Sequence, residues 1–376
     1  MKKQYDVAAY VWLAYTGDCP QTRIFWEKGI GEWQTVQTAK PKFPGHAWPR
    51  KPLWGYCNEA DPSVMEMQID YATQHGVNVF IYDWYWYDNR PFLQQCLENG
   101  FMKAPNTEKM KFYLMWANHD VNFLWDKRNS DTMPEQEILY RGSHNEYEFD
   151  CATDYIVSHY FNAPNYYHID GKPVFMFYMF TKVIEGLGGI ENTRRALDRF
   201  REKAVKAGHK GIYFQTLMLG DGSITANLDG LGSANSSINL IDAAEQLGID
   251  AFTHYQFASL TDIDTTYEAI IPKVVKRYQE IGTQTKLTYY PHVSIGWDNN
   301  VRYEHTFMDK MLRECTPEHF EKMLREAKKF ADTNEVPLIT INSWNEWTEG
   351  SYLLPDDRFG TGYLEAIRRV FLEEEK

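Results

Sequence analysis

The stretch VPLITINSWNEWTEG, residues 336–350, joins an apolar, β-branched run to a dense group of tryptophans and glutamates. The run VPLITI predicts a strand that is buried on both faces, as in a parallel sheet. After it, Glu346 and Glu349 stand three positions apart, and Trp344 and Trp347 surround Glu346. In a barrel of parallel strands, the chemistry lies where the strands end. The stretch is therefore either an unusually aromatic turn or the functional end of the molecule.

Seven other short apolar runs alternate with amphipathic segments along the chain. Helical patterns cover residues 62–76, 192–211, 265–282 and 316–334, with Gly76 placed to end the first and Thr316 to cap the last. The predicted strands are residues 6–13, 77–84, 111–117, 173–179, 211–217, 250–255, 287–294 and 336–344.

Alternation of strands and helices predicts an α/β protein. About eight strand–helix units favour a (β/α)8 TIM-type barrel, with a single domain over residues 1–376. No Gly-rich GxGxxG or Walker loop follows any strand, which disfavours a nucleotide-binding sheet. The long polar or Gly/Pro-rich stretches 14–60, 118–150 and 218–249 are expected to be βα loops that build the active-site face.

The composition narrows the class of partner. A formal net charge of −13 argues against nucleic acid or an anionic membrane surface. No apolar run is long enough to span a membrane. Aromatic residues make up 15% of the chain, and such rings either fill a core or stack on flat ligands such as sugars. Five widely spaced cysteines without a CxxC predict free thiols.

Aromatic and polar side chains recur at the predicted strand ends. Any one of them alone would more often be rim packing, but recurrence on at least five strands favours a ligand platform. The candidate sugar contacts at strand ends are Asp83, Trp84, Trp86, Trp116, Asn118, Tyr255, His292, Trp297, Trp344, Asn345 and Trp347. Glu32 and Trp33 join them, because the long first loop can fold over the barrel mouth.

Glu346 and Glu349 fit the needs of glycosidic bond cleavage. That reaction takes an acid for the leaving oxygen and a second carboxylate as base or nucleophile. A helix-like turn places residues i and i+3 on one side, whereas a β-strand would point the two carboxylates to opposite faces. For both to face one pocket, the chain has to leave the strand by about Asn345. Trp344 and Trp347 would raise a carboxyl pKa. The same spacing equally suits a helix start with Asn345 as its cap.

The segment NSWNEWTEGSYLLPDDRFGTGYLEA, residues 342–366, resembles the glycoside hydrolase family 99-like (WbsX-type) domain. Residues 29–52, 76–90, 168–178 and 296–302 (GWDNNVR) resemble other landmarks of that family in the same order, so the resemblance covers about residues 6–370. It implies a (β/α)8 barrel with endo-acting or related α-glycosidase chemistry that retains the anomeric configuration, and characterised members of family 99 proper act on α-mannosides. It assigns Glu346 as the base on the sugar 2-hydroxyl, through a 1,2-anhydro intermediate, and Glu349 as the acid.

Two segments depart from the family pattern. The first strand reads YVWLAY (10–15) where relatives often have YLPQFHP, and the third strand ends WANHDV (116–121) where they commonly have WANENW. The sugar specificity of the family is therefore not assigned to this protein. A glycosyltransferase-like enzyme of polysaccharide biosynthesis and a non-catalytic sugar-binding barrel remain alternatives.

The remaining expectations concern the surroundings of the site. No cofactor is required, and no metal is expected because His254 and His292 lack paired-ligand spacing. The partner is an oligosaccharide or glycan, and the oligomeric state stays open. No signal peptide is visible, which predicts a cytoplasmic protein, or an extracytoplasmic one if the chain has been trimmed.

Overall fold

The computed structural model describes residues 5–17, 19–126, 137–219, 239–303 and 310–373. Its core is a curled sheet with the strand order β12-β10-β9-β8-β4-β2-β1-β15-β13, in which every neighbouring pair is parallel. The strands on this path are β1 (Asp6–Val11), β2 (Val79–Tyr87), β4 (Lys111–Trp116), β8 (Lys172–Phe177), β9 (Tyr213–Leu217), β10 (Ala251–Thr253), β12 (Thr288–Tyr289), β13 (His292–Ser294) and β15 (Leu338–Asn342).

The two ends of the sheet path are halves of one strand. β12 pairs with β10 and β13 pairs with β15, and only Tyr290 and Pro291 separate them. Pro291 has no N–H for the ladder, so the strand is interrupted there. Tyr290 still donates its N–H to Phe252, and Pro291 accepts from Thr340. The sheet thus curls into a near-closed barrel, and the eight predicted strand positions are all strands.

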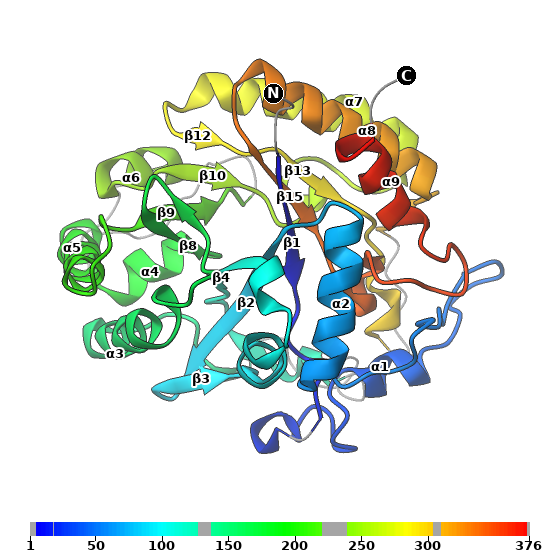
Figure 1. Ribbon diagram of the computed structural model, residues 1–376, viewed down its shortest axis with the longest axis horizontal. Helices are drawn as coiled ribbons and strands as arrows, with labels where there is room; N and C mark the ends of the chain where they lie inside the picture. The colour runs from blue at the N-terminus through cyan, green and yellow to red at the C-terminus, as the bar shows by residue number, and fades with distance from the viewer. Residues whose placement is uncertain (1–4, 18, 127–136, 220–238, 304–309, 374–376) are drawn as a thin grey trace.

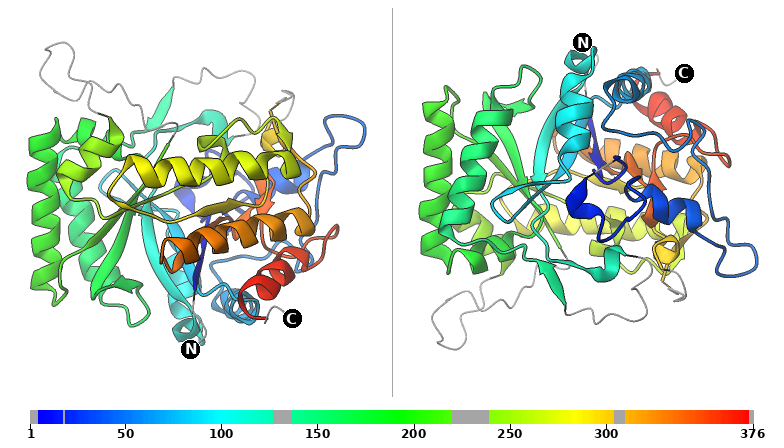
Figure 2. Two further views of the ribbon diagram at one scale, coloured as in Figure 1. Left: turned by 90° about the horizontal axis from the view of Figure 1, so that it is seen from above. Right: turned by 90° about the horizontal axis from the view of Figure 1, so that it is seen from below.

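Helices surround the sheet (Figure 1). Figure 2 shows α7 in yellow and α8 in orange side by side over one face. The predicted helices at 62–76, 192–211, 265–282 and 316–334 are confirmed, and Thr316 caps the last as expected. The helices are α1 (Trp33–Thr38), α2 (Pro62–Gln74), α3 (Glu146–Ile156), α4 (Phe180–Gly186), α5 (Ile190–Lys206), α6 (Leu240–Leu247), α7 (Tyr267–Gln284), α8 (Pro317–Thr333) and α9 (Gly362–Phe371).

The long segments expected as βα loops follow β1, β4 and β9. The first carries α1, and the second carries a small hairpin of β5 (Val121–Asn122) and β6 (Ile138–Tyr140). Residues 127–136 of the second segment and residues 220–238 of the third lie outside the described residues. No helix in the described ranges is long and apolar enough to cross a membrane.

Candidate active site

The chain turns sharply after β15 and carries both glutamates into the barrel mouth. A short hairpin pairs β16 (Asn345–Glu346) with β17 (Ser351–Tyr352), and a single 3-10 turn, Trp347–Glu349, connects them. Gly350 closes the turn at φ +65°, where a Cβ would lie 3.2 Å from Asp298. The expected exit from the strand near Asn345 is therefore present, with a turn only three residues long.

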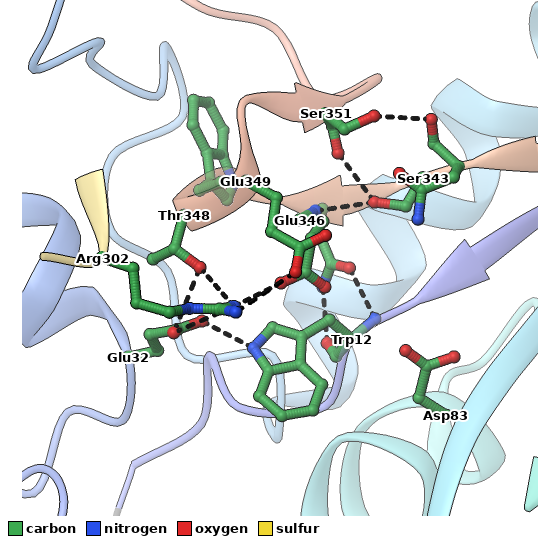
Figure 3. Close-up of polar contacts among 12 residues, drawn as sticks. Trp12, Glu32, Asp83, Arg302, Ser343, Glu346, Thr348, Glu349 and Ser351 are labelled. Atoms are coloured by element: carbon green, nitrogen blue, oxygen red, sulfur yellow. Dashed lines mark hydrogen bonds and ion pairs between the residues drawn. The ribbon is translucent and has the colours of Figure 1, made fainter. Parts of the chain in front are cut away.

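Hydrogen bonds within the hairpin hold Glu346 in place. Ser343 accepts from the backbone N–H of Glu346 at 2.8 Å and donates to the carbonyl of Ser351 at 2.8 Å. Ser351 in turn donates to the carbonyl of Asn342 at 2.7 Å (Figure 3). The reading of Asn345 as a helix cap is wrong, because its side chain bonds the backbone of Trp12 and the carboxyl of Glu59 instead.

A cavity of about 380 Å³ opens beside the two glutamates. Its walls come from the carboxyl ends of β1, β2, β4, β8, β9 and β10 and from the loop after β13, as the functional face of a barrel requires. The lining residues are Trp12, Asp83, Tyr85, Met115, Ala117, His119, Trp125, Tyr178, Met179, Leu219, Tyr255, Arg302, Glu346 and Glu349.

Arg302 joins the two glutamates. Its Nη2 lies 3.1 Å from Glu346 Oε1, and its Nη1 lies 3.2 Å from Glu349 Oε1. The guanidinium also contacts Thr348 Oγ1 at 2.9 Å and stands 3.7 Å from Glu32 (Figure 3). One guanidinium, 15% exposed, therefore faces three buried carboxylates.

The pKa values of both glutamates are displaced. Burial raises the pKa of Glu346 well above its usual range, the charge of Glu349 raises it further, and Arg302 opposes both effects. Burial also raises the pKa of Glu349, again against Arg302. Ionisation of both carboxyls would place two like charges in one buried site, which is energetically unfavourable, so the pair tends to hold one proton.

The two glutamate carboxyl groups have different hydrogen-bond partners. Glu346 accepts from Arg302 on one oxygen and lies 3.4 Å from the Tyr255 hydroxyl on the other. Glu349 accepts from Arg302 on Oε1, while its buried Oε2 has no hydrogen-bond partner among the described residues. Glu346 thus has a second donor within reach, although Tyr255 shares its one proton with Asp83. Glu349 Oε2, by contrast, is free to carry a proton.

Four of the predicted site residues line the cavity: Glu346, Glu349, Asp83 and Tyr255. Glu32 lies directly behind the wall, where it accepts from Trp12 Nε1 at 2.6 Å and from Thr348 at 3.1 Å. Its carboxylate fixes the ring of Trp12, and Trp12 itself faces the cavity.

Trp84, Trp86 and Trp116 face away from the cavity, which corrects their predicted role as sugar contacts. Successive side chains of a strand point to opposite faces. Asp83 and Tyr85 of β2 and Met115 of β4 line the cavity, so the intervening tryptophans point outward. Trp84 bonds Tyr160 at 3.2 Å, Trp86 packs on Tyr155, and Trp116 stacks on His144 and Phe149.

Six further candidates lie outside the cavity. Asn118 clamps the backbone of Met179 through two 2.8 Å hydrogen bonds. His292 is buried between Thr340 and Ser294 at 3.0 Å each. Trp297 lines a separate pocket beside residues 258–263. The other three are buried in or around the hairpin: Trp33 against Tyr15, Trp344 bonded to Gln68, and Trp347 stacked on Tyr352.

Several cavity residues were not among the predicted contacts. Arg302 ends the landmark GWDNNVR, and Tyr85 follows from Asp83 by the two-residue period of a strand. Trp12 and His119 lie in the two segments that depart from the family pattern. His119 donates from Nδ1 to the Asp120 carbonyl at 3.0 Å, so Nε2 accepts from the Tyr85 hydroxyl at 3.3 Å.

No group of three or more His, Cys, Asp or Glu side chains in the described part of the chain is arranged to hold a metal ion. The chemistry on offer is that of two carboxyls with unequal surroundings, one guanidinium and an aromatic wall. Trp12 forms edge contacts with Tyr85 and Trp125, with ring centroids 5.7 and 5.2 Å apart. An apolar ring face beside paired carboxyls suits a sugar-sized ligand.

Comparisons with known proteins agree with this arrangement. The profile of the family described as "Glycosyltransferase WbsX" matches residues 17–367. "Uncharacterized protein WxcX" of Xanthomonas campestris pv. campestris is 24% identical over 358 residues, which are 93% of this chain and 47% of that protein. The chain thus spans about half the length of the curated relatives that it matches.

Two similar solved structures are glycoside hydrolases or resemble them. The GH99 endo-alpha-mannosidase from Bacteroides thetaiotaomicron has 16% identity and a TM-score of 0.58, over 96% of this chain and 95% of that one. A "Glycoside hydrolase-like protein" has 15% identity and a TM-score of 0.60, over 98% and 94%. The chain therefore belongs to the WbsX family and has a glycoside hydrolase-like fold that resembles the GH99 endo-alpha-mannosidase.

Proposed function

We propose that this protein is a retaining glycoside hydrolase that cleaves an α-linked glycan, with Glu346 as base and Glu349 as acid. The observation that carries the proposal is the contact of Arg302 with both carboxyl groups in one cavity at the barrel mouth. Arg302 donates to Glu346, and the unpartnered Oε2 of Glu349 is able to present a proton. An acid and a base in one cavity are what glycosidic cleavage requires.

The raised pKa of Glu346 is compatible with a basic role. One of its causes is the charge of Glu349, and that cause disappears when Glu349 carries the proton. Glu346 is then the ionised member, with Arg302 as its donor and the Tyr255 hydroxyl within 3.4 Å. Protonated Glu349 and ionised Glu346 form the pair that begins the reaction.

The proposed reaction has two steps. Glu346 takes the proton of the sugar 2-hydroxyl, O2 displaces the leaving oxygen from C1, and Glu349 protonates that oxygen, which yields a 1,2-anhydro sugar. Water then attacks C1 while Glu349 accepts its proton and Glu346 returns a proton to O2. Each step inverts C1, so the product retains the anomeric configuration, and both glutamates regain their starting protonation.

Transfer to an acceptor hydroxyl is the second candidate, because the matching family is described as a glycosyltransferase. The cavity charge weighs against an anionic sugar-nucleotide donor. Among the described lining residues the only Arg or Lys is Arg302, and three carboxylates already face it. Product analysis with and without sugar nucleotides separates transfer from hydrolysis.

The test compares Glu346→Gln and Glu349→Gln with the parent on aryl α-glycosides and α-linked oligosaccharides, including mannosides. We expect turnover of a cleaved oligosaccharide to fall by at least about 10²-fold in each variant, as for the loss of an acid or base. Glu108→Gln, which removes an exposed carboxyl, is the control and should retain activity. Full turnover in both active-site variants would rule out the assignment, and binding without cleavage by the parent would indicate a sugar-binding barrel instead.

A further inference from the structure

Asp83 is a third carboxyl on the cavity wall that the proposed reaction does not use. It lies in β2 and is 2% exposed. Its Oδ2 accepts from the Tyr255 hydroxyl at 3.0 Å, but its buried Oδ1 has no hydrogen-bond partner among the described residues. Figure 3 draws no interaction from the Asp83 side chain to Glu346 or to Trp12.

A buried carboxyl oxygen without a partner costs folding free energy. Native proteins satisfy nearly all such groups, and the exceptions need an explanation, of which a ligand that supplies the missing partner is one. Glu349 Oε2 is the second unpartnered carboxyl oxygen on the same cavity. Asp83 Oδ1 therefore marks a place where a bound molecule can donate a hydrogen bond, whereas Glu349 Oε2 is the oxygen that carries the proton in the proposed reaction.

Tyr255 ties Asp83 to the reacting part of the cavity. Its hydroxyl lies 3.0 Å from Asp83 Oδ2 and 3.4 Å from Glu346 Oε2. A hydroxyl has one proton, so it cannot fully satisfy both carboxyls at once. Because one hydroxyl reaches both groups, Asp83 and Glu346 face the same part of the cavity.

The charged groups around the cavity limit the charge that a bound sugar ring can carry. Asp83, Glu346 and Glu349 supply acidic groups, and Arg302 is already shared among Glu346, Glu349 and Glu32. Burial lowers the pKa of His119, so its imidazole adds no positive charge at neutral pH. An anionic ring would meet carboxyl groups without an available cation among the described lining residues.

We propose that Asp83 selects the reacting sugar: its free oxygen accepts a hydrogen bond from a hydroxyl or ammonium group of the ring beside Glu346, and the cavity takes uncharged or positively charged rings. This inference rests on the proposed function. It makes Asp83 a specificity-determining residue that contacts the substrate.

The experiment measures binding to the full chain by saturation-transfer NMR. The probes are the methyl α-glycosides of mannose, glucose and galactose, methyl α-glucosaminide and methyl α-glucuronide. We expect at least one neutral glycoside or the glucosaminide to bind the parent, and the glucuronide not to bind. Asp83→Ala should weaken that binding about tenfold, as for the loss of one hydrogen bond. Asp250→Asn is the control, because Asp250 accepts from Phe214 just before β10 begins.

A second measurement separates recognition from structural support. Asp83→Asn keeps the size of the side chain and removes a buried carboxyl with an unpartnered oxygen, so its Tm should equal or exceed that of the parent while sugar binding weakens. Unchanged binding in Asp83→Ala, tighter binding of the glucuronide than of the glucoside, or a lower Tm in Asp83→Asn would each overturn the inference and leave the proposed function intact. No binding of any probe to the parent would remove both.

Discussion

Asp298 donates its backbone N–H to the carbonyl oxygen of Glu349 at 2.7 Å. Its side chain has two further tasks. Oδ2 accepts from His46 at 2.7 Å and Trp48 at 3.0 Å, and Oδ1 accepts from the backbone and side chain of Asn300. Asp298 thus joins the first long loop to the 3-10 turn Asn299–Val301 that directly precedes Arg302.

Loss of the Asp298 carboxylate should therefore misplace Arg302 and Glu349 together. We expect Asp298→Ala to lower kcat about tenfold or more, since small displacements of a catalytic group are costly. KM should change less, because Asp298 does not line the cavity. Kinetics on the cleaved glycoside provide the measurement, with Asp264→Ala as a control, because Asp264 pairs with Arg313 at an exposed site. An unchanged kcat would contradict this role.

Replacement of Arg302 by Met should destabilise the protein in a pH-dependent way. Removal of one member of a buried ion pair costs roughly 3–5 kcal/mol. The pKa values of Glu346 and Glu349 are already raised in the folded state, and Arg302 lowers them, so they rise further in the variant. Groups with raised folded-state pKa values favour folding at low pH and lose that advantage as pH rises.

The deficit of Arg302→Met relative to the parent should consequently be larger at pH 8 than at pH 5. Urea unfolding at the two pH values measures it. Arg313→Met removes a half-exposed pair with Asp264 and should change the free energy of unfolding by less than about 1 kcal/mol. A deficit that is the same at both pH values would show that Arg302 does not act through the two carboxyls.

Ionisation of Glu59 should contribute strongly to the change in the free energy of unfolding between about pH 5 and pH 8. Burial raises the pKa of Glu59 to about 8 from 4.5, although Gln68 and Asn345 donate to it at 3.2 and 2.8 Å. The folded protein therefore holds a proton between these values that the unfolded chain has lost. The free energy of unfolding should fall as pH rises from about 5 to 8.

Glu59→Gln mimics the protonated side chain and should flatten that fall by several kcal/mol, since each pKa unit corresponds to about 1.4 kcal/mol. Chemical denaturation at several pH values from 5 to 8 measures the slope. The exposed substitution Glu108→Gln should leave the slope unchanged. An equally steep slope in Glu59→Gln would mean that Glu59 is ionised throughout this range.

Some of the site could not be predicted from the sequence, and β2 shows why. All nine residues of its run VFIYDWYWY are buried, so no alternation of polar and apolar residues reveals which face meets the cavity. Only the position of Asp83 indicates the phase, and it assigns Tyr85 inward and Trp84 and Trp86 outward. In a strand buried on both sides, composition alone does not separate ligand contacts from core packing.

The sequence by itself determined the eight strands, their order along the chain and the position of Glu346 and Glu349 after the last one. These features rest on local patterns: apolar runs, helix caps and residue spacing. Only the tertiary structure decided which side chains surround the glutamates. Arg302, Tyr255, Asp83 and Trp12 come from other strands and loops and meet Glu346 and Glu349 because the curled sheet brings the carboxyl ends of its strands together.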